Sequence, residues 1–230
     1  MPYPETYPAE AASPTATDLT GRLCPRLTGP GEVARRLAEL DERYIRSRFT
    51  PLADVAASRE GGLAAARQAM TDGLLPQPAY RLDDGTDMVP PEYFDLVDAA
   101  GGIEALPGWF SGRYAAAARK LGLPDDEETV AEQWDDYLSG GYFVCLREVT
   151  PETIAQKALL ISTLEELLAN PAPQDSGWAG RLRAEVGALA AIERTGALLD
   201  PARWGGPMSP QWYGAYLRGY YPQVFEPDHE

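Results

Sequence analysis

The sequence predicts a mostly α-helical protein with one small β-hairpin in its N-terminal half. Beyond residue 30, apolar residues recur every three or four positions, which is the spacing of an amphipathic helix. These stretches open on proline or short polar residues and close on glycine or asparagine, as helices do. Two short extended runs flank an Asp-Gly pair, which is typical of a hairpin. An apolar content of 44% is enough to bury a core.

Both ends of the chain are predicted to be tails. Residues 1–30 are rich in proline, threonine, serine and alanine and contain few large aliphatic side chains. Such a segment cannot offset its ordering entropy by burial, so we expect disorder there. A second short tail is expected at residues 227–230. The remainder divides at Gly101-Gly102 into two expected units, residues 31–102 and residues 103–226.

The first unit should begin with a helix at Gly31. One apolar stripe recurs there at spacings of four, three and four (Val33, Leu37, Leu40 and Tyr44). Thr50-Pro51 predicts the start of a short helix, because a cap is followed by proline at the first helical position. Ser58 is then expected to cap a helix from Arg59 to Met70.

A hairpin and another helix complete this unit. Extended runs end at Leu82 and resume at Met88, with Asp83-Asp84-Gly85-Thr86 between them. Pro90-Pro91 predicts a further helix start, and Gly101-Gly102 predicts its end.

The order helix, short helix, second helix and hairpin is that of a winged helix-turn-helix. The segment from Ala53 to Phe94 resembles the MerR-type DNA-binding module, whose turn and wing are matched by Gly73-Leu74-Leu75-Pro76 and Tyr80-Arg81-Leu82. The resemblance implies a DNA-facing surface that carries Arg59, Arg67 and Arg81. Residues 31–95, however, hold eight Arg against twelve Asp and Glu, whereas a DNA-reading surface shows clustered positive charge. A scaffold or a protein contact is therefore favoured, and DNA binding is the alternative.

The second unit is expected to be a helical domain. The run from Tyr142 to Leu146 is apolar but too short to assign by its period. Elsewhere in this unit, apolar faces and caps predict helices around residues 109–121, from 124 to 138, from 150 to 170, around 178–189, and from 209 onward.

Charge and composition exclude several classes of function. The formal net charge is −15, from 35 acidic and 20 basic residues, which argues against a general nucleic-acid binder and against binding to an anionic membrane. The single histidine is His229, and the two cysteines, Cys24 and Cys145, lie far apart, so we predict no metal site. Nucleotide-binding glycine motifs are missing as well, and we predict no cofactor. Without a signal-peptide pattern, a cytoplasmic protein is expected, and its oligomeric state is left open.

Aromatic residues gather near the C-terminus and are the best candidates for a small-molecule pocket. Residues 204–225 contain two Trp, four Tyr and one Phe, which can line a pocket or simply pack a helical core, and both interpretations remain open. In the pocket hypothesis, Arg203 holds an anionic group and tyrosines exchange a proton. The candidate catalytic residues are Tyr142, Tyr213 and Tyr216, and the candidate substrate-binding residues are Trp134, Arg203, Trp204 and Trp212.

The helical half is similar to a family of unknown function. The resemblance rests on residues 137–142, Val144-Cys145-Leu146, Thr150-Pro151-Glu152, Trp204-Gly205-Gly206-Pro207 and Tyr221-Pro222. It implies natural-product biosynthesis in an actinomycete, and 18 Arg among 20 basic residues fit the coding bias of a high-GC bacterium. No catalytic residue carries over from it.

Three hypotheses of function follow. The first is a cofactor-independent biosynthetic protein that binds a pathway intermediate in the helical domain; a cyclisation or isomerisation step is its catalytic form, and whether it is catalytic is left open. The second is a MerR-like regulator of a biosynthetic cluster. The third is a protein-interaction partner of a pathway enzyme.

Overall fold

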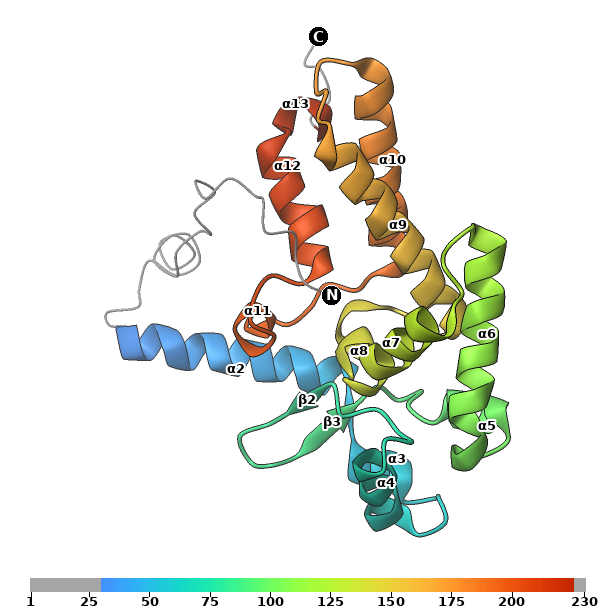
Figure 1. Ribbon diagram of the computed structural model, residues 1–230. Helices are drawn as coiled ribbons and strands as arrows, with labels where there is room; N and C mark the ends of the chain where they lie inside the picture. The colour runs from blue at the N-terminus through green and yellow to red at the C-terminus, as the bar shows by residue number, and fades with distance from the viewer. Residues whose placement is uncertain (1–29, 226–230) are drawn as a thin grey trace.

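The computed structural model describes residues 30–225 and confirms a mostly helical protein with a small antiparallel sheet (Figure 1). Of the two predicted tails, only Pro30 is among the described residues; the rest of both tails, with Cys24 and His229, lies outside them. None of the helices within residues 30–225 is both long and apolar enough to cross a membrane.

Helix α2 (Pro30–Arg48) opens the described chain and meets the rest of the protein through its C-terminal half. Figure 1 shows its N-terminal turns projecting from the body, and their side chains are mostly exposed. Asp41 and Ile45, by contrast, are 1% exposed, so the inner face of the last turns is fixed against the core.

The first two misplaced helix starts in this unit were predicted one and three residues too early. Thr50–Pro51 forms strand β1, and helix α3 (Leu52–Ala56) begins only after it. Helix α4 (Gly62–Thr71) begins at Gly62 instead of Arg59, because the left-handed φ angles of Gly61 (70°) and Gly62 (56°) interrupt any helix that would continue from Arg59.

The predicted hairpin is confirmed as strands β2 (Tyr80–Arg81) and β3 (Asp87–Val89). Strand β1 adds to the other edge of β3, which gives the antiparallel order β1-β3-β2. Tyr80 pairs with Met88 across one edge, and Thr50 pairs with Val89 across the other. The sheet therefore ties the end of α2 to the hairpin.

The middle of the chain forms short helices around two longer ones. Helix α5 (Asp95–Ala100) begins five residues after the predicted start at Pro90-Pro91, because residues 90–94 form turns. A 3₁₀ turn, Ile103–Ala105, leads into α6 (Leu106–Leu121). Helix α7 (Glu127–Leu138) is capped by Asp126, which accepts a hydrogen bond from the Thr129 amide at 3.0 Å. The unassigned run after it is helix α8 (Gly141–Cys145).

The last part is built on helices α9 (Pro151–Ala169) and α10 (Ser176–Ile192), which pack against each other (Figure 1). Helix α9 begins at Pro151, as the Thr-Pro-Glu sequence predicts, and Thr150 and Thr153 form a reciprocal capping box there. A short helix α11 (Asp200–Arg203), a π-helical segment η2 (Pro210–Tyr216), α12 (Leu217–Tyr220) and α13 (Pro222–Phe225) follow.

Two hydrophobic clusters hold these elements together. The larger one runs from Ile45 to Ala155 and joins α2, the sheet and helices α3 to α8 to the first turn of α9. The smaller one joins the rest of α9 to α10, η2, α12 and α13. The larger cluster includes residues on both sides of the predicted boundary at 102/103. The winged-helix assignment and the domain boundaries stay predictions.

A close backbone approach fixes the turn between α7 and α8. Gly140 has a φ of 81°, and a Cβ at this position would lie 2.5 Å from the carbonyl oxygen of Gln77. The Gln77 amide donates to the carbonyl of Leu138 at 2.8 Å, so the segment after α4 lies directly over this turn. Only glycine permits this approach, which orients α8 and its aromatic residue Tyr142.

Replacing Gly140 by alanine should therefore destabilise the protein more than the same change at a left-handed glycine in open space. Gly122, which ends α6 with a φ of 72° and no atom near its missing Cβ, is the matched control. Left-handed backbone alone costs an alanine about 1–2 kcal/mol, and forced displacement of packed atoms adds about 1–3 kcal/mol. Chemical unfolding of G140A and G122A measures the difference, and equal losses would show that the Gln77 contact is not restrictive.

Candidate functional site

A half-open cavity of about 260 Å³ lies among α7, α8, α9 and the segment that leads into η2. Its walls are mostly apolar and aromatic, and polar side chains from each element reach it. The lining residues whose chemistry matters are Gln133, Asp136, Tyr142, Cys145, Lys157, Glu165, Trp204, Ser209 and Tyr213.

Helix α9 supplies one whole wall because its residues recur on a single face. Ile154, Lys157, Ala158, Ile161 and Glu165 follow at spacings of three, one, three and four, which is one stripe of an α-helix. The stripe changes from apolar to charged toward the C-terminal end of α9. Lys157 is the exception, since it is a lysine within the apolar part and only 7% exposed.

All three N–H groups of the Lys157 ammonium have partners inside the protein. Its Nζ lies 2.9 Å from the Cys145 sulfur, 2.7 Å from the Ser209 hydroxyl and 2.9 Å from a carboxylate oxygen of Glu193. The Ser209 hydroxyl in turn donates to that carboxylate. Glu193 is 4% exposed and lies at the C-terminal end of α10, so this buried pair connects four separate segments.

The protonation states in this cluster follow from burial and charge. Burial alone lowers the pKa of Lys157, but its hydrogen bond to Cys145 and its ion pair with Glu193 outweigh burial, so the pKa is raised and the ammonium stays charged. Burial raises the pKa of the Cys145 thiol despite the nearby ammonium, so the thiol is neutral at pH 7. Cys145 is thus a buried, unpaired thiol that accepts a hydrogen bond from Lys157.

The outer part of the cavity carries hydroxyl groups and carboxylates. Tyr142 donates to the side-chain oxygen of Gln133 at 2.8 Å, and burial raises the pKa of its phenol well above the ordinary value. The Tyr213 hydroxyl lies 3.5 Å from a carboxylate oxygen of Glu165. Within residues 30–225, Asp136 and Glu165 form no ion pair, so this end of the cavity is negatively charged.

The structure brings three of the seven predicted pocket residues together. Tyr142, Trp204 and Tyr213 line the cavity. Trp134 does not; its ring packs 5.3 Å from Phe110 and 5.4 Å from Tyr137, measured between centroids. The remaining two aromatic candidates also lie outside the lining: Trp212 packs edge-to-face on Tyr216 with centroids 5.6 Å apart.

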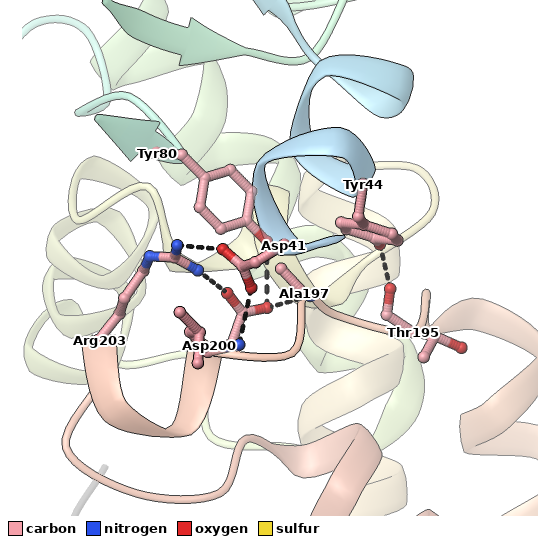
Figure 2. Close-up of polar contacts among 8 residues, drawn as sticks. Asp41, Tyr44, Tyr80, Thr195, Ala197, Asp200 and Arg203 are labelled. Carbon is pink, nitrogen blue, oxygen red and sulfur yellow. Dashed lines mark hydrogen bonds and ion pairs between the residues drawn. The ribbon is translucent and has the colours of Figure 1, made fainter. Parts of the chain in front are cut away.

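Arg203, the predicted anion-binding residue, is paired with carboxylates of the protein itself (Figure 2). Its guanidinium contacts Asp41 of α2 and lies 3.2 Å from Asp200. Asp200 is fully buried and also accepts from the Tyr80 hydroxyl at 3.1 Å and the Ala197 amide at 2.6 Å. This group of Asp41, Tyr80, Asp200 and Arg203 joins α2 and the sheet to α11, and the cavity lies elsewhere.

The three arginines of the DNA-binding alternative are also paired internally. Arg59 holds both carboxylate oxygens of Asp98, one of them at 2.8 Å. Arg67 and Arg81 share the buried Asp87, at 2.9 and 2.7 Å. A DNA phosphate would therefore have to compete with these carboxylates for each guanidinium.

Several lining residues were missed by sequence reasoning. Lys157, one of two lysines in the chain, stands on the apolar stripe of a strongly predicted helix, and that position is a readable signal. Glu165 lies two turns further along the same stripe. The sequence indicates only a helix start at Ser209, whereas its hydroxyl accepts a hydrogen bond from Lys157 and donates one to Glu193.

A family model described as a family of unknown function, DUF6058, matches residues 106–220. The chain belongs to this family. The matched segment runs from the first residue of α6 to the last residue of α12 and contains every residue that lines the cavity. The predicted resemblance to a family of unknown function is confirmed at that level. No curated protein and no solved structure matches the chain.

Breaking the buried pair from one side should cost the protein far more than breaking an exposed pair. K157M leaves Glu193 buried without its cation, which is expected to lower the free energy of unfolding by about 3–5 kcal/mol. K157M/E193Q removes both charges and should recover part of that loss. The control is Arg113 with Glu152, whose side chains are 53% and 43% exposed and whose pair is worth about 0–1 kcal/mol.

Urea unfolding of the single and double variants measures these energies as a double-mutant cycle. A K157M loss no larger than that of R113M would show that the Lys157 contacts are not maintained in solution.

Proposed function

We propose that this protein is a natural-product biosynthesis protein that binds a small pathway intermediate in the cavity beside α9. The supporting observation is the cavity itself: aromatic and aliphatic walls, about 260 Å³ of space, and polar groups that converge from four elements. Ligand sites of drug-sized molecules span about 300–1,000 Å³, so the ligand is expected to be smaller than those.

The charges in the cavity favour a ligand with a basic amine. Lys157 is neutralised by Glu193, whereas Asp136 and Glu165 carry charge with no cation beside them within the described chain. Tyr142, Trp204 and Tyr213 add ring surfaces to the same space. Carboxylates and aromatic faces both attract an organic cation, and rings also stack on an apolar ligand body.

The same groups support proton transfer without a cofactor, in the catalytic form of the proposal. The Glu165 carboxylate can accept a proton, and the Tyr142 phenol, which its raised pKa keeps protonated, can donate to a developing negative charge by exchanging its hydrogen bond to Gln133 for one to the ligand. An isomerisation or cyclisation requires this pairing of acceptor and donor. Lys157 then takes no part in proton transfer and holds the surrounding elements in place, since its three N–H groups already have partners in the protein.

The N-terminal unit is proposed to serve as a winged-helix-like scaffold. In support, α2, α3 and α4 are followed by the β2–β3 hairpin, in the order expected of that fold. The ion pairs of Arg59, Arg67 and Arg81 disfavour the alternative of a MerR-like regulator, because DNA would have to compete with Asp98 and Asp87 for them.

Filling the cavity should abolish ligand capture. Ala158 lines it from α9, so A158F places a ring in the space, whereas A131F on the exposed face of α7 does not. Each purified protein is incubated with a metabolite extract of its native host and desalted, and the released compounds are identified by mass spectrometry. We expect a basic amine retained by the wild type and A131F and lost from A158F.

Two results would oppose the proposal. Equal retention by all three proteins would place binding outside the cavity. Retention of nothing by the wild type, with a DNA fragment captured instead from sheared host DNA, would favour the regulator.

A further inference from the structure

A second depression, on another part of the surface, is lined by three arginines. It has a volume of about 570 Å³ and lies between the C-terminal end of α2 and the segments that follow α8 and α10. Its lining residues are Tyr44, Ser47, Arg48, Pro91, Glu92, Arg147, Arg194 and Thr195. None of these residues lines the cavity beside α9.

Arg194 is the fixed member of this arginine depression. Its side chain is 16% exposed, and its Nε and Nη2 donate to the carbonyls of Leu146 at 2.6 Å and Arg147 at 3.0 Å. Nη2 also lies 3.5 Å from a carboxylate oxygen of Glu92. These bonds leave the Nη1 hydrogens without a protein partner in the described chain, and they set the guanidinium in one orientation.

Arg48 and Arg147 carry uncompensated charge at the same place. Neither forms an ion pair with a carboxylate within residues 30–225, although the chain has many more acids than bases. Both lie close enough to act on the Tyr44 phenol. Burial and the charge of Asp200 raise the pKa of this phenol, and the positive charges of Arg194, Arg48 and Arg147 oppose the rise without cancelling it.

Three guanidinium groups face the single carboxylate of Glu92 among the lining residues, so the depression carries a net positive charge that an anion would offset. Hydrogen bonds to carbonyl groups explain the position of the Arg194 guanidinium, but within residues 30–225 the side chains of Arg48 and Arg147 make no such bond. A nearby anion relieves the repulsion and satisfies the free N–H groups together.

We propose that the arginine depression binds a phosphate group. A phosphate carries close to two negative charges at pH 7 and presents three oxygens, which suits several forked guanidinium groups better than a single carboxylate does. The volume also exceeds that of free phosphate, and Tyr44 and Pro91 offer apolar surface for an organic portion.

Isothermal titration calorimetry at constant ionic strength tests this with inorganic phosphate and with phenyl phosphate. The variants are R48Q and R147Q, whose side chains are exposed, and R181Q on the exposed face of α10 is the matched control. We expect R48Q and R147Q each to weaken phosphate binding by about tenfold or more, and R181Q to leave it unchanged. Tighter binding of phenyl phosphate assigns the site to a phosphate ester, and equal binding assigns it to free phosphate.

Two outcomes would overturn the proposal. One is a dissociation constant weaker than about 1 mM for both probes. The other is equal loss of affinity in R181Q, which would mean that the probes respond only to net charge. The A158F variant separates this site from the cavity beside α9: it should bind both probes as the wild type does.

Discussion

The buried ion pair between Lys157 and Glu193 is the constraint on which the shape of the cavity depends. A charge this far from water needs its partner at contact distance, so α9 and the end of α10 are held in one relation. Cys145 brings α8 to the same ammonium, and Ser209 brings the start of η2. Three of the cavity's four sides thus meet at one nitrogen atom, the Nζ of Lys157. The positions of the aromatic lining residues are set in turn, because these residues lie on or next to the same elements.

Local chemistry was enough to predict most helices and the hairpin. Thr150-Pro151 and Asp84-Gly85 act through their own backbone preferences, so their effect is visible without knowledge of the fold. Strand β1 was not predictable in this way, because two residues have no period and its pairing with β3 comes from far along the chain. The predicted start of α4 was too early because Ser58 is a good N-cap residue in the sequence, whereas the N-cap in the structure is Gly61 with its left-handed φ.

The candidate site was predicted only where a single residue carried the signal. Tyr142, Trp204 and Tyr213 line the cavity, whereas the other three aromatic candidates pack against neighbouring rings, because an aromatic side chain with a polar tip suits a pocket and a core equally well. The roles of Lys157 and Arg203 depend on partners from other segments: Glu193 for one, and Asp41, 162 residues away, for the other. A guanidinium in a sequence looks equally available for a ligand or for the protein's own acids, and only the fold decides between them.

The contacts in Figure 2 show that the family segment, residues 106–220, depends on residues that precede it. Residues 106–220 include Asp200 and Arg203, yet the groups that satisfy them, Tyr80 and Asp41, precede that segment. The carbonyl of Gln77 that closes over Gly140 also precedes it, as does much of the larger hydrophobic cluster. The segment recognisable by common descent is therefore smaller than the unit that folds. A relative that keeps both Asp200 and Arg203 would need some equivalent of α2 and the sheet, supplied by its own chain or by another, to pair with them.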